Sequence, residues 1–264
     1  MSNDNPLEPT NGELDVEALV SRLARISDLN QRSNAIAIRI KDLENEIILE
    51  TIKSVQEKTL LGNPEYRRVY SGLIVAGTLN RTLGKERMSE LVALAQDKQY
   101  YEVVAILMDL PSDTDDEVMH QPYLDADLKE MSLGMRKYLA RQPDLELVER
   151  IARDQDHRVL HNLLYNPRLT EKDVVRIAAT RPNSPKILEE IYNHPKWIER
   201  YAIKKSIVMN PVCPVSLALK LLAFMKAQDL KEIAKNQKLS LVLRNEVGRI
   251  MVKKMGLVKD NQTG

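Results

Sequence analysis

Two stretches of the C-terminal half, RVLHNLLYNP at residues 158–167 and AIKKSIVMNP at residues 202–211, share one plan. Each is a short run with apolar residues at helical spacing, and each ends in Asn-Pro. Proline cannot continue a helix, but it suits the first turn of the next one. The two stretches therefore predict short helices separated by fixed stops.

The same punctuation recurs along this half of the chain. Four residue–proline pairs are each followed by a short apolar helix pattern (LELVERIA, EKDVVRIA, KILEEIY and SLALKLLA): Gln142-Pro143, Asn166-Pro167, Arg181-Pro182 and Asn210-Pro211. The intervals between them are uneven, but Ile-Ala or Ile-Tyr pairs at residues 151, 191 and 233 recur at the longer period of paired-helix repeats. We therefore expect a right-handed α-solenoid of short helical repeats.

Local capping residues support this register. Thr170 is expected to cap the helix that begins at Glu171, with Asp173 completing a capping box. Ser184 and Pro185 are expected to act as cap and first-turn proline of the following helix.

The segment from about residue 143 to 251, with phrases such as NPRLTEKDVVRIA and NSPKILEEIYNHPKW, resembles the bacterial leucine-rich repeat variant family. More loosely, it is similar to HEAT and armadillo repeats. The resemblance implies a curved stack of short helices with no shared chemistry. Some members of that family carry a cysteine cluster for an iron–sulfur centre, whereas Cys213 is the only cysteine here.

Composition agrees with an all-α protein. The 264 residues are 43% hydrophobic, include only nine glycines, and are rich in helix formers. A single cysteine allows no internal disulfide and fits a reducing compartment. The N-terminus lacks an apolar signal segment, and the apolar stretch at residues 72–79 is too short to span a bilayer, so we expect a cytoplasmic protein.

Charge runs and proline divide the chain into five expected parts: a disordered leader (1–12), an N-terminal helical module (13–110), an acidic linker (111–124), the repeat domain (125–255) and a tail (256–264). Expected helices in the module span residues 14–26, 30–58, 65–83, 85–96 and 99–110, and another at 125–141 leads into the repeats. The long 30–58 helix should be the buried axis of the module, with Ile40 and Ile47 in its apolar stripe. A coiled-coil seam is the alternative.

The two halves carry opposite charge. Residues 1–130 hold 14 Lys/Arg against 24 Asp/Glu, net −10, and residues 131–264 hold 25 against 14, net +11. The basic half could pack on the acidic half, form a solvated face, or bind an acidic partner. Candidate partner-binding residues are the cations expected on turns and second helices of the repeats: Arg153, Arg158, Arg168, Arg176, Arg200, Lys204 and Lys205.

The sequence offers little for catalysis. His157 and His161 are spaced for one helix face, but no third ligand is evident, so we expect no metal site. The glycine spacing fits no nucleotide-binding loop, there is no GxSxG, and Cys213 lies between prolines. We therefore predict no enzyme activity, no catalytic residue and no cofactor.

These observations favour a non-enzymatic adaptor or scaffold that binds an acidic protein through its basic repeat face. The alternative is a nucleic-acid-binding HEAT-like protein, including a base-excision enzyme. Nucleic-acid binding usually adds exposed aromatic side chains, but Trp197 is expected in the core between repeats. The sequence leaves the partner and the oligomeric state open.

Overall fold

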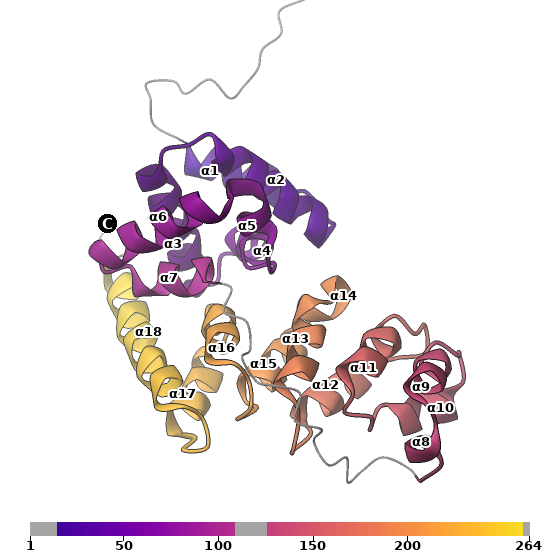
Figure 1. Cartoon of the computed structure of the whole chain (residues 1–264). Helices are drawn as coiled ribbons and strands as arrows, with labels where there is room; N and C mark the ends of the chain where they lie inside the picture. Colours follow the sequence, from indigo (N-terminus) through magenta and orange to yellow (C-terminus); the bar gives the residue numbers. More distant parts are fainter. Residues whose placement is uncertain (1–14, 109–125, 261–264) are drawn as a thin grey trace, which may run out of the picture. The chain divides into compact units, whose positions relative to one another are not determined.

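The computed structural model describes residues 15–108 and 126–260, and in these ranges the chain forms eighteen helices and no strand. The all-α prediction is confirmed there. The chain divides into two compact units, Met1–Met108 and Asp109–Gly264, coloured indigo to magenta and magenta to yellow in Figure 1. The expected leader (1–12) and linker (111–124) lie outside the described residues.

The first unit contains seven of these helices: α1 (Val16–Ala24), α2 (Leu29–Lys41), α3 (Asn45–Leu60), α4 (Pro64–Leu73), α5 (Thr78–Leu83), α6 (Lys85–Asp97) and α7 (Tyr101–Leu107). Its central helix is α4, which contacts α1, α2 and α3. Tyr66, Val69 and Tyr70 of α4 are buried in this core. Burial raises the pKa of the Tyr70 hydroxyl.

The predicted continuous helix over residues 30–58 is wrong. The chain turns between α2 and α3, and the break interrupts the apolar stripe on which the coiled-coil alternative depended. Ile40 is buried as expected, whereas Ile47 is only half-buried and Ile48 takes the core position. α4, rather than a long second helix, is therefore the buried axis of the unit.

A side chain from elsewhere in the unit holds this break. Arg87 of α6 donates through Nε to Asn45 Oδ1 at 2.9 Å, and its two terminal nitrogens donate to the carbonyls of Lys41 and Leu43. These carbonyls lie at the end of α2, where no further helical turn supplies backbone N–H donors to them. Arg87 thus stabilises the corner between α2 and α3, which the local sequence does not predict.

The predicted helix over residues 65–83 is also divided, into α4 and α5. Gly77, which precedes α5, has a φ of +69°, in the left-handed region that favours glycine. A second glycine, Gly72, allows α4 to approach α2 closely, because a Cβ at this position would lie 2.7 Å from Ile36 Cδ1. The predicted helix over 125–141 is likewise two helices in the structure, with Ser132 as the N-cap of the second.

The second unit contains the remaining eleven helices: α8 (Ala126–Glu130), α9 (Leu133–Leu139), α10 (Leu145–Ile151), α11 (His157–Leu164), α12 (Glu171–Ala179), α13 (Pro185–Asn193), α14 (Pro195–Ile198), α15 (Tyr201–Val208), α16 (Val215–Leu222), α17 (Ala227–Lys235) and α18 (Leu241–Asp260). Residues 256–260, expected in a tail, continue α18. Figure 1 shows these helices following one another in chain order from α8 to α18. Their main contacts join helices close in sequence, such as α9 with α11, α11 with α13, and α12 with α15.

Asn166 explains the first Asn-Pro stop. This buried side chain donates to the carbonyls of Ala140 and Gln142, both at 2.8 Å, and accepts from the backbone N–H of Arg168. It therefore joins the C-terminal end of α11 to the C-terminal end of α9. The two helices run parallel, since Arg136 of α9 also bonds to Asp154, just before α11.

Asn210 repeats this arrangement after α15. It donates to the carbonyls of Ala178 and Thr180 at 2.8 and 3.1 Å and accepts from the N–H of Val212. Here the C-terminal ends of α12 and α15 are joined. The two Asn-Pro stops thus perform one task, each binding the turn at the end of a parallel neighbour.

The two asparagines lie on opposite edges of the helix stack. Gln155, before α11, donates to the carbonyl of Pro182, after α12, so α12 leads from the C-terminal end of α11 back to its N-terminal end. We name the edge with the α9–α10 and α11–α12 connections the Asn166 edge. The edge with the α10–α11, α12–α13 and α15–α16 connections is the Asn210 edge.

The predicted caps have two outcomes. Thr170 and Asp173 form the full capping box, with the Thr170 hydroxyl accepting from the Asp173 N–H. Ser184 occupies the N-cap position before Pro185, but its hydroxyl caps no backbone group there.

Trp197 is buried as expected and donates from Nε1 to the carbonyl of Leu164 at 2.8 Å.

The net charges of the two units differ when only the described residues are counted. Residues 15–108 hold 13 Lys/Arg and 13 Asp/Glu, net 0, whereas residues 126–260 hold 26 and 16, net +10. The described part of the first unit is therefore neutral, and the negative excess belongs to residues outside it.

Candidate functional site

Most of the seven predicted partner-binding cations are engaged within the second unit. Arg158 makes a two-pronged contact with Asp156, at 3.0 and 2.8 Å, and Arg176 bonds to Asp173 at 3.0 Å. Although burial opposes it, the bonds from Arg158 hold the pKa of Asp156 below its ordinary value. The charges of these two arginines are thus matched by neighbours on their own helices.

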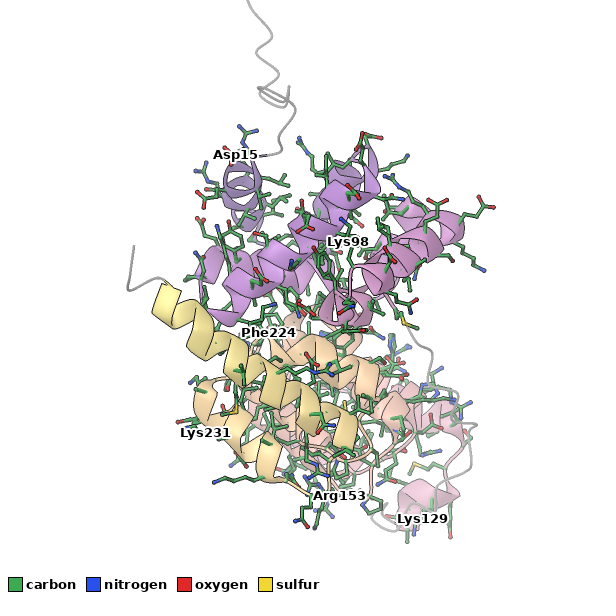
Figure 2. All side chains as sticks on the ribbon, turned by 90° about the vertical axis from the view of Figure 1, so that its left-hand side faces the viewer. Asp15, Lys98, Lys129, Arg153, Phe224 and Lys231 are labelled. Atoms are coloured by element: carbon green, nitrogen blue, oxygen red, sulfur yellow. The ribbon has the colours of Figure 1, made fainter. Side chains whose placement is uncertain are left out.

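The cations of α15 are engaged across helices. Lys205 bonds to Asp229 and Glu232 of α17 at 2.8 and 2.9 Å, which raises the pKa of Lys205. Arg200 lies 3.9 Å from Glu171 of α12. Lys204 is buried, with Nζ 3.8 Å from the ring centre of Phe224, which is labelled in Figure 2. These three side chains serve the packing of the unit.

Arg153 and Arg168 differ from the other five, because both are exposed and neither pairs with a carboxylate among the residues that the structure describes. Arg153, labelled in Figure 2, precedes α11 on the Asn210 edge, and Arg168 follows α11 on the Asn166 edge. The eight residues of α11 separate these edges by about 12 Å. The seven predicted residues therefore do not form one patch.

The predicted histidine pair faces a carboxylate. His157 Nδ1 lies 3.5 Å and His161 Nδ1 2.9 Å from the two oxygens of Glu190 on α13. Among the described residues, no group of three or more His, Cys, Asp or Glu is arranged to hold a metal ion. The pair thus joins α11 to α13.

Next to this pair, a row of rings runs along the Asn166 edge. Tyr165 lies between His161 and His194, with ring centres 5.5 and 4.5 Å away, and His194 lies 6.1 Å from Trp197. His194 is only 7% exposed, and neither of its ring nitrogens has a hydrogen-bond partner among the described residues. Burial, together with the charge of Lys196, lowers the pKa of His194 to about 4, so the ring is neutral near pH 7.

Tyr165 itself is 64% exposed, and three exposed cations lie at the same edge. Arg141 reaches α11 through its bond to Asn162 at 2.7 Å, Arg168 follows the Asn166 bridge, and Lys196 lies 4.0 Å from the ring centre of Trp197. None of the three pairs with a carboxylate among the described residues. We call Arg141, His161, Tyr165, Arg168 and Lys196 the Tyr165 patch.

Only Arg168 of this patch was expected from the sequence. Arg141 lies in the α9–α10 connection, Tyr165 at the end of α11 and Lys196 in α14, and only the folded edge brings them together. Tyr165 also belongs to the YNP phrase, where a tyrosine before the stop is equally compatible with a core position.

Cys213 gives no sign of a reactive thiol. It is half-buried, and burial raises the pKa of its thiol. A thiolate, the nucleophilic form, is therefore scarce.

Within the ranges 15–108 and 126–260, no helix has the length and apolar character needed to cross a bilayer. Comparisons with protein-family models, curated proteins and solved structures find no match.

Proposed function

We propose that this chain is a non-enzymatic adaptor or scaffold of the α-solenoid type, whose second unit binds an acidic partner protein. Support for the architecture comes from the parallel neighbours α9–α11 and α12–α15, and from the two asparagine bridges that repeat one contact along the stack. The resemblance to leucine-rich repeat variant, HEAT and armadillo sequences belongs to the same proposal. Stacks of this kind present long surfaces to partners.

The observation that carries the proposal is an exposed apolar surface on α9 and at the start of α10. Met135 and Tyr138 lie one turn apart on α9 and are 49% and 58% exposed, and Leu145 at the start of α10 is also exposed. An end helix of a repeat stack normally presents a polar outer face to water. Methionine and tyrosine are instead enriched at the centres of protein interfaces.

Charge favours an acidic partner. The excess of ten positive charges over residues 126–260 gives the second unit a field that attracts acidic surfaces and repels basic ones. Arg158, Arg200 and Lys205 are poor choices for testing this attraction, since reversing them would break the internal pairs described above.

The experiment is affinity capture from the source cell with the full chain as bait. The test variant is Met135→Asp with Tyr138→Asp, and the matched control is Leu241→Asp with Val242→Asp, an equally exposed apolar pair at the start of α18. We expect the wild type and the control to capture the same acidic protein, and the test variant to lose it. Capture of identical proteins by all three baits would contradict the proposal.

A further inference from the structure

We propose that the Tyr165 patch is a binding site for single-stranded nucleic acid. It shares no residue with the apolar surface of Met135, Tyr138 and Leu145, although Arg141 adjoins Tyr138 at the end of α9. It does not rest on the adaptor function. The proposal follows from an exposed aromatic ring placed among cations that have no carboxylate partner.

The patch is held together by contacts within one edge. The Asn166 side chain joins the connection that carries Arg141 to the one that carries Tyr165 and Arg168. The indole of Trp197 donates to the carbonyl of Leu164, which brings α14, with Lys196, to the same end of α11. The backbone segments that carry the three cations are therefore held at the same edge as Tyr165.

Three acidic groups at this edge already have partners of their own. Glu190 faces His157 and His161, Glu171 faces Arg200, and Asp144 accepts the backbone N–H groups of Glu146 and Leu147 at the start of α10. The positive charge of Arg141, Arg168 and Lys196 is thus available to an anionic ligand.

Two chemical features favour a nucleic acid over an acidic peptide. Guanidinium groups match phosphate oxygens in a forked geometry, and phosphates recur at a regular interval that suits cations spread along an edge. An exposed tyrosine ring adds a platform on which an unpaired base can stack whatever its sequence. Carboxylates of an acidic peptide would use the cations but not the ring.

The buried His194 ring supports the platform. It lies beneath Tyr165 at 4.5 Å, and its burial keeps it neutral, so it adds no charge and holds the tyrosine on a rigid base. Bases in a duplex are already stacked on one another, so the Tyr165 ring should distinguish single strands from double strands.

The test measures anisotropy of labelled oligonucleotides of about 12 nucleotides, as single-stranded DNA, single-stranded RNA and duplex of one sequence, against the full chain. We expect at least one single strand to bind more tightly than the duplex at low salt. Tyr165→Ala should weaken that binding about tenfold, while Tyr165→Phe retains it. Tyr101→Ala, at an exposed tyrosine of the first unit, is the matched control and should have no effect.

The arginines provide a second comparison. Arg168→Ala should reduce the slope of log affinity against log salt by about 0.7, the contribution of one phosphate contact on a single strand. Arg153→Ala removes another exposed arginine, at the other end of α11, and should leave the slope unchanged.

Three results would overturn the proposal: no single strand binds at low salt, Tyr165→Ala binds as the wild type does, or polyglutamate displaces the oligonucleotide at equal charge concentration. The last result would assign the patch to acidic peptides. Circular dichroism of each variant checks that the fold is kept, and Tyr165→Leu, which covers His194 without a ring, should bind as weakly as Tyr165→Ala.

Discussion

In the first unit, the corner between α2 and α3 is held by Arg87, which lies 42 to 46 residues further along the chain. In the second unit, Asn166 and Asn210 hold corresponding corners through contacts 24 to 32 residues back, and both do so in the same way. One region thus uses a single long-range contact, and the other uses a repeated contact between neighbours in the stack. Loss of the Arg87 contact should therefore destabilise only the α2–α3 corner, whereas loss of an asparagine bridge should destabilise successive helices.

The largest expected effect tests the corrected core of the first unit. Ile40→Asp places a carboxylate at a position that is 1% exposed, and we expect it to lower the free energy of unfolding by more than about 3 kcal/mol. Ile38→Asp, two residues away but 62% exposed, should change it by less than about 0.5 kcal/mol. Urea unfolding of the full chain measures both. If both variants lost the same free energy of unfolding, Ile40 would not lie on the buried face of α2.

Acid should weaken the second unit through His194. Because its folded pKa of about 4 lies below the ordinary value of 6.5, the unfolded chain binds the proton more readily. The stabilisation is complete above pH 6.5 and is lost as pH falls toward 4, by about 2 kcal/mol at pH 5. Hydrogen exchange at pH 7 and 5 should show this loss around α11, α13 and α14.

The matched variant for this effect is His194→Phe, which keeps a ring between Tyr165 and Trp197 but cannot titrate. Its stability should be nearly independent of pH between 7 and 5. If the wild type and His194→Phe lose stability equally over this interval, another group is responsible for the acid sensitivity.

Removing either bridging asparagine should lower the stability of the second unit by a similar amount, because both make the same kind of contact. Asn166→Ala and Asn210→Ala each leave two carbonyls without their donor, and we expect losses of about 1.5 kcal/mol in each case. Exchange should rise on both parallel neighbours of the altered asparagine. Asn193→Ala, at an exposed asparagine of α13, is the control and should be silent.

The smallest expected effect concerns the long-range corner. Arg87→Met keeps the aliphatic stem but removes three donors, and we expect a loss of about 1 kcal/mol because water can reach this partly exposed site. Faster exchange should be confined to the end of α2 and the start of α3. Faster exchange throughout the first unit would show that the corner is not a local feature.

The sequence predicted the second unit better than the first for a physical reason. The prolines of the Asn-Pro stops and the Thr170 capping box act within a few residues, so they indicate helix ends locally, although the distant carbonyls that the asparagines bind were not predicted. The break between α2 and α3 depends on a guanidinium from α6, and the apolar pattern over residues 30–58 contains no proline or glycine to indicate it. Local patterns therefore predicted a continuous helix there.

The candidate site was predictable in charge but not in position. Arg158, Arg176, Arg200 and Lys205 are basic residues whose carboxylate partners become apparent only when helices are packed or turns are formed. Conversely, no sequence pattern singles out Arg141 and Lys196, because only the fold places them at the same edge as Tyr165.

The asparagine bridges also restrict how such a chain can grow or shrink through gene duplication and deletion. Each bridge requires that the helix before the asparagine and the helix whose end it binds run in the same direction. One helix that crosses from edge to edge separates each pair, α10 in the first and α13 in the second, because the four residues of α14 stay on the Asn166 edge. Inserting or deleting one crossing helix between the bridged helices would reverse one of them and move the asparagine to the edge opposite its carbonyls. Changes in length between bridged helices must therefore add or remove crossing helices in pairs.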